Sequence, residues 1–227
     1  MPSLLELPKT GLLGKLKAGT REALVEHISV RKFRAGTEVV DFEDEKTNVY
    51  VLLEGTARAI LVSDEGRLVA YRSIKEGDVF GEMAALTGQK RSASVEAHTD
   101  ILVGVLSETA FVFLCESYSD FIVAIARELA NLVASLTKRV FEQTTLEVRP
   151  RVARELVRIV RAVDKSDTDM AQLVPAPTHS SLAAQIGCER EAVTKALRQL
   201  DERGLIQKNR RNIKIPSIRA LLIRSEI

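Results

Sequence analysis

The chain has 227 residues, of which 45% are hydrophobic and 28% are charged, an ordinary composition for a globular protein and enough length for two domains. Its two cysteines, Cys115 and Cys188, lie far apart, which excludes a disulfide framework and a cysteine metal site and fits a reducing cytoplasm. The N-terminus has no signal-peptide pattern, and the longest apolar runs are far too short to cross a bilayer. We therefore expect a cytoplasmic protein with no membrane partner and no metal.

Charge is distributed unevenly along the chain, although the formal net charge is only +2. The segment from Arg149 to the C-terminus holds 16 basic and 9 acidic residues, a net of +7, so the rest of the chain is net −5. A basic C-terminal third beside an acidic body predicts a polyanionic partner for that third.

The N-terminal half shows a change from helical to strand patterning. Short helices are expected over residues 4–30, where apolar residues recur at helical spacing. From Phe33 onward, short runs rich in β-branched residues alternate with turns that contain glycine. The expected strands are residues 37–40, 49–53, 57–62, 68–74 and 101–106. Many short strands at close spacing predict a β-sandwich or a barrel.

One motif interrupts these strands. It opens with Gly81-Glu82 and closes with Arg91-Ser92-Ala93. A short helical turn there would present backbone N–H groups to an anion, and Arg91 can fork onto a phosphate. The carboxylate of Glu82 can accept hydrogen bonds from a sugar hydroxyl. A phosphate and a ribose in a small pocket predict a cyclic mononucleotide; the alternative is an ordinary surface turn with a solvated Glu and Arg.

A short helix is expected at residues 111–114, followed by a long helix from Ser119-Asp120. Apolar residues of the long helix are spaced 3, 4, 3 and 4 apart, which is the seam of a left-handed coiled coil. These residues are Ile122, Ile125, Leu129, Leu132 and Leu136. We expect a parallel homodimer along this seam; the alternative is an amphipathic helix that packs on its own barrel.

The C-terminal third begins with a proline signal. Arg149-Pro150 ends the long helix and marks a hinge, and a new helix is expected at about residues 150–163, followed by a polar loop over residues 164–169. Helices over residues 178–185 and 189–203, joined at Gly187, form a helix-turn-helix pattern. Residues 204–215 then predict a β-hairpin wing.

The exposed side chains of this pattern suit DNA. We expect the second helix to enter the major groove, because arginine can fork onto guanine and glutamate can accept from cytosine. Its candidate contacts are Arg190, Glu191, Thr194, Lys195 and Arg198. The wing tip would bind phosphates through Lys208, Arg210 and Arg211. The alternative is a solvated face on a small helical domain.

Together, the Gly81–Ala93 motif and the helix-turn-helix over residues 178–203 resemble the Crp/Fnr-type bacterial transcription regulators, in their cyclic-nucleotide-binding, catabolite-activator branch. The resemblance covers nearly the full length and implies an α+β fold. It implies an N-terminal β jelly-roll domain that binds a cyclic nucleotide (residues 1–117), a dimerisation helix with a hinge (118–148) and a winged helix-turn-helix domain that binds DNA (149–227).

The resemblance also implies roles for the residues of the first motif. In the family the glycine and glutamate hold the ribose, here Gly81 and Glu82, and the arginine and serine hold the cyclic phosphate, here Arg91 and Ser92. Two adjacent hydroxyl residues on the family's long helix meet the purine; of the corresponding pair only Thr137 matches, because its neighbour is a leucine. The resemblance favours cAMP as the ligand, with cGMP as the alternative.

In the C-terminal domain, Thr178 and His179 fall on the family's phosphate-contacting positions. Arg190, Glu191 and Lys195 fall on its base-contacting positions, with Lys195 in place of an arginine. The resemblance therefore implies contacts to both the backbone and the bases of double-stranded DNA.

The expected function is that of a homodimeric transcription regulator, not an enzyme, gated by a cyclic mononucleotide, which binds palindromic promoter sites and works with RNA polymerase. Two alternatives stay open: a family member with an empty or different-ligand pocket that binds DNA constitutively, and a cyclic-nucleotide module that regulates another protein. The N-terminal region holds no cysteine, which excludes a four-cysteine iron–sulfur cluster. A haem ligand at His27 or His98 also stays open.

Overall fold

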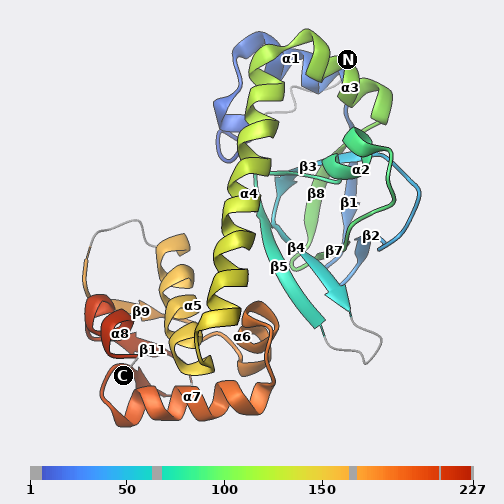
Figure 1. The fold of residues 1–227 in the computed structure, drawn as a ribbon. Coiled ribbons are helices and arrows are strands. Elements are labelled where there is room, and N and C mark those ends of the chain that lie inside the picture. The colour runs from blue at the N-terminus through green and yellow to red at the C-terminus, as the bar shows by residue number, and fades with distance from the viewer. Residues whose placement is uncertain (1–6, 63–67, 164–167, 210, 226–227) are drawn as a thin grey trace. The chain divides into compact units, whose positions relative to one another are not determined.

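The computed structural model describes residues 7–62, 68–163, 168–209 and 211–225. The chain divides into two compact units, Met1–Ala134 and Ser135–Ile227, and the division falls within the long helix α4 (Ser119–Thr145) (Figure 1). The expected domain boundaries, after residues 117 and 148, place that helix in a segment of its own.

Two antiparallel four-stranded sheets build the first unit (Figure 1). In order, one sheet consists of β1 (Ser29–Phe33), β8 (Ile101–Leu106), β3 (Val49–Glu54) and β6 (Val79–Phe80). The other consists of β2 (Glu38–Val40), β7 (Ser94–Ala97), β4 (Thr56–Val62) and β5 (Leu68–Lys75). Strands distant in sequence are neighbours in both sheets, for example β1 with β8 and β2 with β7. This arrangement confirms the jelly-roll expectation.

Strand β3 lies at the centre of the first unit and is buried on both faces. Its Tyr50 and Leu52 belong to the core between the two sheets, and its Val49, Val51 and Leu53 belong to a second core beneath the helices. Successive side chains of a strand point to opposite faces, so a strand that is covered on both sides must be apolar throughout.

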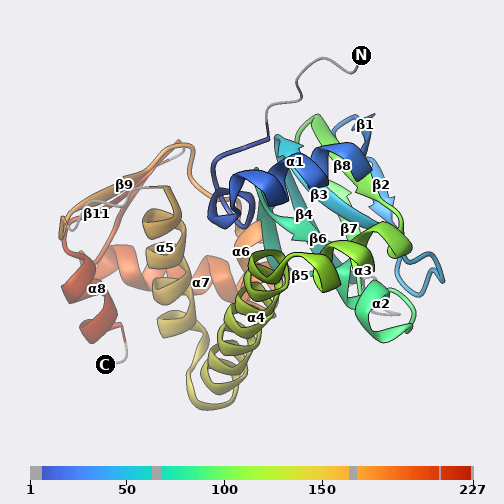
Figure 2. The same ribbon diagram turned by 90° about the horizontal axis from the view of Figure 1, so that it is seen from above.

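Helices cover the outer face of the β1-β8-β3-β6 sheet (Figure 2). They are the 3-10 turn Leu13–Lys15, α1 (Ala18–His27), α3 (Glu108–Ser117) and the first part of α4. Leu24 of α1, Phe111 of α3 and Phe121 of α4 are fully buried there. Two predicted boundaries are wrong, since β1 starts at Ser29 inside the expected helical region and α3 is longer than residues 111–114.

The apolar residues of α4 lie in two environments. Ile125 is buried in the core of its own unit and Leu129 packs partly against that core, as the amphipathic-helix alternative requires. Other apolar side chains of the same helix are exposed, among them Val133 at 63%, Val140 at 59% and Phe141 at 62%. Part of the seam therefore stabilises the barrel, and a different stripe of the helix is left open to solvent.

The second unit contains helices α5 (Val148–Val163), α6 (His179–Ile186), α7 (Arg190–Glu202) and α8 (Ile218–Arg224). It also contains a three-stranded antiparallel sheet in the order β10 (Gln207–Lys208), β11 (Ile213–Ile215) and β9 (Ala171–Leu173). One apolar core joins these elements, with Leu156, Leu182 and Leu197 fully buried in it. This confirms the helix-turn-helix and the wing.

The turn between α6 and α7 follows from local chemistry. The Thr178 hydroxyl caps α6 by accepting a hydrogen bond from the backbone N–H of Ser181 at 3.0 Å. Gly187 ends the helix with a φ of +65°, and the N–H of Cys188 returns to the carbonyl of Ala183 at 3.1 Å. A tight left-handed turn is thus fixed directly before α7.

Some C-terminal details differ from expectation. Helix α5 begins at Val148 rather than Pro150, which becomes its third residue. Strand β9 and helix α8 were not expected at all. Residues 164–167 of the polar loop and Arg210 of the wing tip lie outside the described residues. In the parts of the chain that the structure describes, no single helix is long and apolar enough to cross a membrane; α3 and α4 meet that test only as a pair bent by 109°.

Candidate nucleotide pocket and DNA-binding surface

The Gly81–Ala93 motif forms the short helix α2 (Glu82–Thr87) and the loop that follows it. Gly81 precedes the helix with a φ of +83°, in the left-handed region that favours glycine. A Cβ at this position would lie 2.7 Å from Nη1 of Arg91 and 3.0 Å from the carbonyl oxygen of Asn48. Glycine therefore allows the two ends of the motif to approach each other.

Arg91 is a buried cation, with 4% of its surface exposed. Its Nη1 donates to Gly81 O at 2.8 Å and its Nη2 to Asn48 O at 2.7 Å. Its Nε is buried without a hydrogen-bond partner. Burial lowers the pKa of the guanidinium, which Tyr50, Asp44 and Glu82 oppose. Among the described residues, no carboxylate forms a salt bridge with Arg91, so its charge is balanced only at longer range.

Glu82 lies at the start of α2 and is 6% exposed. Its Oε1 is 3.6 Å from Nη1 of Arg72 on β5. Burial raises the pKa of the Glu82 carboxyl above its usual range, while the positive charges of Arg72 and Arg91 act in the opposite direction. Glu82 is thus the acidic group of a small buried cluster that also contains the guanidinium groups of Arg72 and Arg91.

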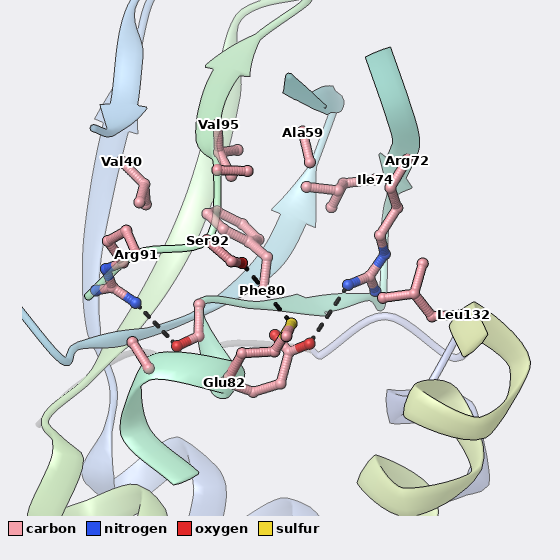
Figure 3. Close-up of a pocket in the computed structure, with 14 residues that line it drawn as sticks. Val40, Ala59, Arg72, Ile74, Phe80, Glu82, Arg91, Ser92, Val95 and Leu132 are labelled. Carbon is pink, nitrogen blue, oxygen red and sulfur yellow. Dashed lines mark hydrogen bonds and ion pairs between the residues drawn. The ribbon is translucent and has the colours of Figure 1, made fainter. Parts of the chain in front are cut away.

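A cavity of about 40 Å³ opens between these groups (Figure 3). Its lining combines apolar side chains, most of them from strands, with the polar groups of the motif and of Arg72 on β5. The lining residues are Val40, Ala59, Arg72, Ile74, Phe80, Gly81, Glu82, Met83, Ala84, Arg91, Ser92, Ala93, Val95 and Leu132. Four of the five expected ligand residues are therefore together: Gly81, Glu82, Arg91 and Ser92.

Two residues of the pocket region differ from expectation. Thr137, the fifth expected ligand residue, is exposed on α4 and belongs to the second unit. Arg72 lines the cavity and was not expected there. The sequence carried a partial signal, since Arg72 and the apolar Ile74 are two residues apart on one expected strand and therefore point to the same face.

In the second unit, the five expected base-reading residues are all exposed on α7: Arg190, Glu191, Thr194, Lys195 and Arg198. Arg190, Thr194 and Arg198 are each four residues apart, as are Glu191 and Lys195, so the five form two adjoining rows on one side of the helix. Arg198 forms an exposed ion pair with Glu202 at 3.3 Å.

His179 brings three parts of this surface together. Its Nε2 lies 2.7 Å from Nζ of Lys208 on the wing, and its Nδ1 lies 2.7 Å from Oγ1 of Thr194 on α7. An ammonium group can only donate, so Nε2 accepts from Lys208 and Nδ1 carries the proton that is donated to Thr194. Burial, then Lys208 and Arg190, lower the pKa of His179. Thr178 and Arg211 are exposed on the same unit.

His27 has an ordinary structural environment. It stacks on Phe113 with ring centroids 5.3 Å apart, and its Nδ1 lies 2.7 Å from the carbonyl oxygen of Ala23. No group of three or more His, Cys, Asp or Glu that could hold a metal ion occurs in the described ranges.

Comparison with known protein families gives two matches, one in the N-terminal and one in the C-terminal part of the chain. Residues 30–118 match the cyclic nucleotide-binding domain, and residues 150–223 match the Crp-like helix-turn-helix domain. The chain belongs to the Crp/Fnr family. Members of this family are DNA-binding transcription regulators, not enzymes.

Individual relatives of this Crp/Fnr regulator are similar over most of their length. The cAMP-activated global transcriptional regulator Vfr of Pseudomonas aeruginosa is 25% identical over 91% of this chain and 94% of its own. The transcriptional regulator SdrP of Thermus thermophilus is 29% identical over 83% of this chain and 90% of its own. A crystal structure of a Crp/Fnr-family regulator, also from Thermus thermophilus, is 26% identical to this chain. The similarity covers 88% of this chain and 100% of that one, with a TM-score of 0.69.

Proposed function

We propose that this regulator is a homodimer whose affinity for DNA is gated by a cyclic mononucleotide bound in the cavity beside α2. Arg91 and Ser92 hold the cyclic phosphate, and Gly81 and Glu82 hold the ribose. Thr137 takes part in recognition of the base. These assignments follow the family pattern that the sequence carries.

The observation that carries the proposal is the state of Arg91. A buried cation is stable only when its N–H groups and its charge are satisfied. Arg91 has two carbonyl partners, a buried Nε–H without a partner, and no salt-bridged carboxylate among the described residues. A cyclic phosphate supplies one negative charge and oxygen acceptors, which is what this guanidinium lacks.

The size of the cavity bears on how gating works. At about 40 Å³ it has room for only a few water molecules. We infer that the side chains around Arg91 and Glu82 move when a nucleotide binds. A ligand that binds one conformation better than another shifts the population toward it. The second candidate is a regulator of the same fold that binds DNA without any nucleotide.

For the DNA-binding part, we propose that α7 reads bases in the major groove and that the wing and α6 bind phosphates. In a symmetric dimer the two copies of α7 would meet half-sites about 34–36 Å apart, in a palindrome. The exposed apolar stripe on α4, with Val133, Val140 and Phe141, supports association of two copies. We also propose the three-segment division 1–117, 118–148 and 149–227, a cytoplasmic location and RNA polymerase as a partner.

The test is a DNA titration with and without nucleotide. A duplex is first selected from random sequences by the full-length protein, and its affinity is measured with no nucleotide, with cAMP and with cGMP. Gating predicts that one nucleotide raises the affinity for the selected duplex at least tenfold. Equal affinity in all three conditions would favour the constitutive candidate.

A further inference from the structure

Arg72 stands out among the pocket residues that the family pattern does not explain. It lies on β5, and its side chain is 18% exposed. Its Nη2 donates to the carbonyl oxygen of Val79 at 3.0 Å, and its Nη1 is 3.6 Å from Oε1 of Glu82. A guanidinium has five N–H donors, and these are the two polar partners of Arg72 among the described residues. The side chain of Arg72 also lines the cavity.

The pocket has two ends, each with an arginine (Figure 3). Arg91 lies at one end with its hydrogen bond to Gly81 O, and Arg72 lies at the other end beside Leu132, with Glu82 between them. A cyclic nucleotide is an ordered chain of phosphate, ribose and base. If Arg91 takes the phosphate and Glu82 the ribose, the base points toward Arg72.

We propose that Arg72 reads the purine and that the pocket therefore selects guanine over adenine, which makes cGMP the ligand. This inference rests on the proposed function. Guanine presents two acceptors, O6 and N7, at the spacing of an arginine fork. Adenine presents N7 beside the donor N6–H₂, so a guanidinium in the same place would meet a donor with a donor. The expectation of cAMP rested on the family resemblance, which assigns no role to Arg72.

Glu82 provides the switch between the two uses of Arg72. Without a nucleotide, Arg72 neutralises the buried carboxylate of Glu82. When ribose hydroxyls donate to Glu82, that carboxylate is satisfied by the ligand, and the arginine fork is released to face the base. The planar fork is required, so a lysine at this position would keep the charge and lose the recognition.

The test is calorimetric titration of the full-length protein with three nucleotides. They are cGMP, cAMP and inosine 3′,5′-cyclic monophosphate, which keeps O6 and N7 of guanine but lacks its 2-amino group. The wild type should bind cGMP and the inosine nucleotide with similar affinity, and both more tightly than cAMP by roughly 5- to 150-fold. Arg72→Lys, which keeps the positive charge beside Glu82, should lose this preference while its affinity for cAMP changes less than about threefold.

The matched control is Arg58→Gln. Arg58 lies on the neighbouring strand β4 and pairs with Glu96 at 3.0 Å, and it does not line the cavity. Arg58→Gln should keep the guanine preference. If the wild type binds cAMP as tightly as cGMP, or if Arg72→Lys retains the preference, the role of Arg72 is overturned and the proposed function stands. If no cyclic nucleotide binds the wild type, both fail.

Discussion

Gly81 and Arg91 approach so closely that a Cβ on the glycine would lie 2.7 Å from Nη1 of the arginine. The same Nη1 donates to the carbonyl oxygen of Gly81 at 2.8 Å. The two ends of the motif are thus joined by one hydrogen bond that only a glycine permits. A positive φ of +83° at Gly81 adds a second reason for glycine.

Gly81→Ala should therefore displace Arg91 and weaken nucleotide binding at least tenfold. It should also lower the free energy of unfolding by about 1–2 kcal/mol through its left-handed backbone. Gly36→Ala is the matched control, because Gly36 has a φ of +82° and nothing within 4 Å of its Cβ position. Both changes are measured by urea unfolding and by calorimetry. Equal nucleotide affinity in the two variants would argue against the close approach.

Glu142 is a buried carboxylate, 3% exposed, that joins the end of α4 to α5 through ion pairs with Arg158 and with Arg154, the latter at 3.5 Å. Arg158 also pairs with Glu155 at 2.9 Å. Glu142→Ala leaves these guanidinium groups without their shared partner. Its cost should be about 1–3 kcal/mol, less than for a fully buried pair because the Arg158 side chain keeps 31% of its exposure.

The control for this change is Glu202→Ala, which removes the exposed partner of Arg198. Exposed pairs contribute little, so its effect should stay below about 0.5 kcal/mol. Denaturant unfolding of the full chain measures both variants. Similar values for the two would mean that the Glu142 cluster does not stabilise the second unit.

His179 predicts a pH dependence of stability. Its pKa is lowered in the folded protein, by burial first and then by the charges of Lys208 and Arg190. As the pH falls below about 6.5, the unfolded chain takes up a proton that the folded chain resists, so the free energy of unfolding falls. The wild type should therefore lose more stability than His179→Gln between pH 7 and pH 5.5. Parallel curves for the two proteins in thermal unfolding would contradict this environment for His179.

The proposed DNA contacts are of two kinds, base contacts from α7 and phosphate contacts from the wing. Arg190→Ala should cost about 1–3 kcal/mol on the best duplex and relax the preference at one base pair. Arg211→Ala should weaken binding to all sequences alike and flatten the salt dependence. Titrations on selected and random duplexes at several salt concentrations measure both. An equal loss on both duplexes for Arg190→Ala would mean that α7 does not read bases there.

Local signals in the sequence were enough for much of the fold. The glycine turns and β-branched runs predicted the strands of the sandwich, and Gly187 between two apolar-faced segments predicted the helix-turn-helix. Strand β9 was not predicted, because it has only three residues and forms by pairing with β11, about forty residues later in the chain. Such long-range pairing leaves no periodic pattern in a short segment.

The pocket was predictable only in part, for a related reason. The residues of one continuous motif, Gly81 to Ser92, could be found together. Arg72 reaches the same cavity from another strand, and its exposure depends on which face of β5 is inward. The contacts of Arg91 with the carbonyls of Gly81 and Asn48 also required coordinates, because backbone acceptors have no signature in the sequence.

The measurement that most directly tests nucleotide gating is calorimetry on the wild type and on Arg91→Leu, with cGMP and with cAMP. The wild type should bind a cyclic nucleotide, and Arg91→Leu should lose that binding, because a cyclic phosphate cannot leave water without a fixed cation and oriented donors. Circular dichroism should show that the variant is folded, and its affinity for the selected duplex should no longer respond to nucleotide. If Arg91→Leu binds either nucleotide as tightly as the wild type, the phosphate site and the gating mechanism are both contradicted.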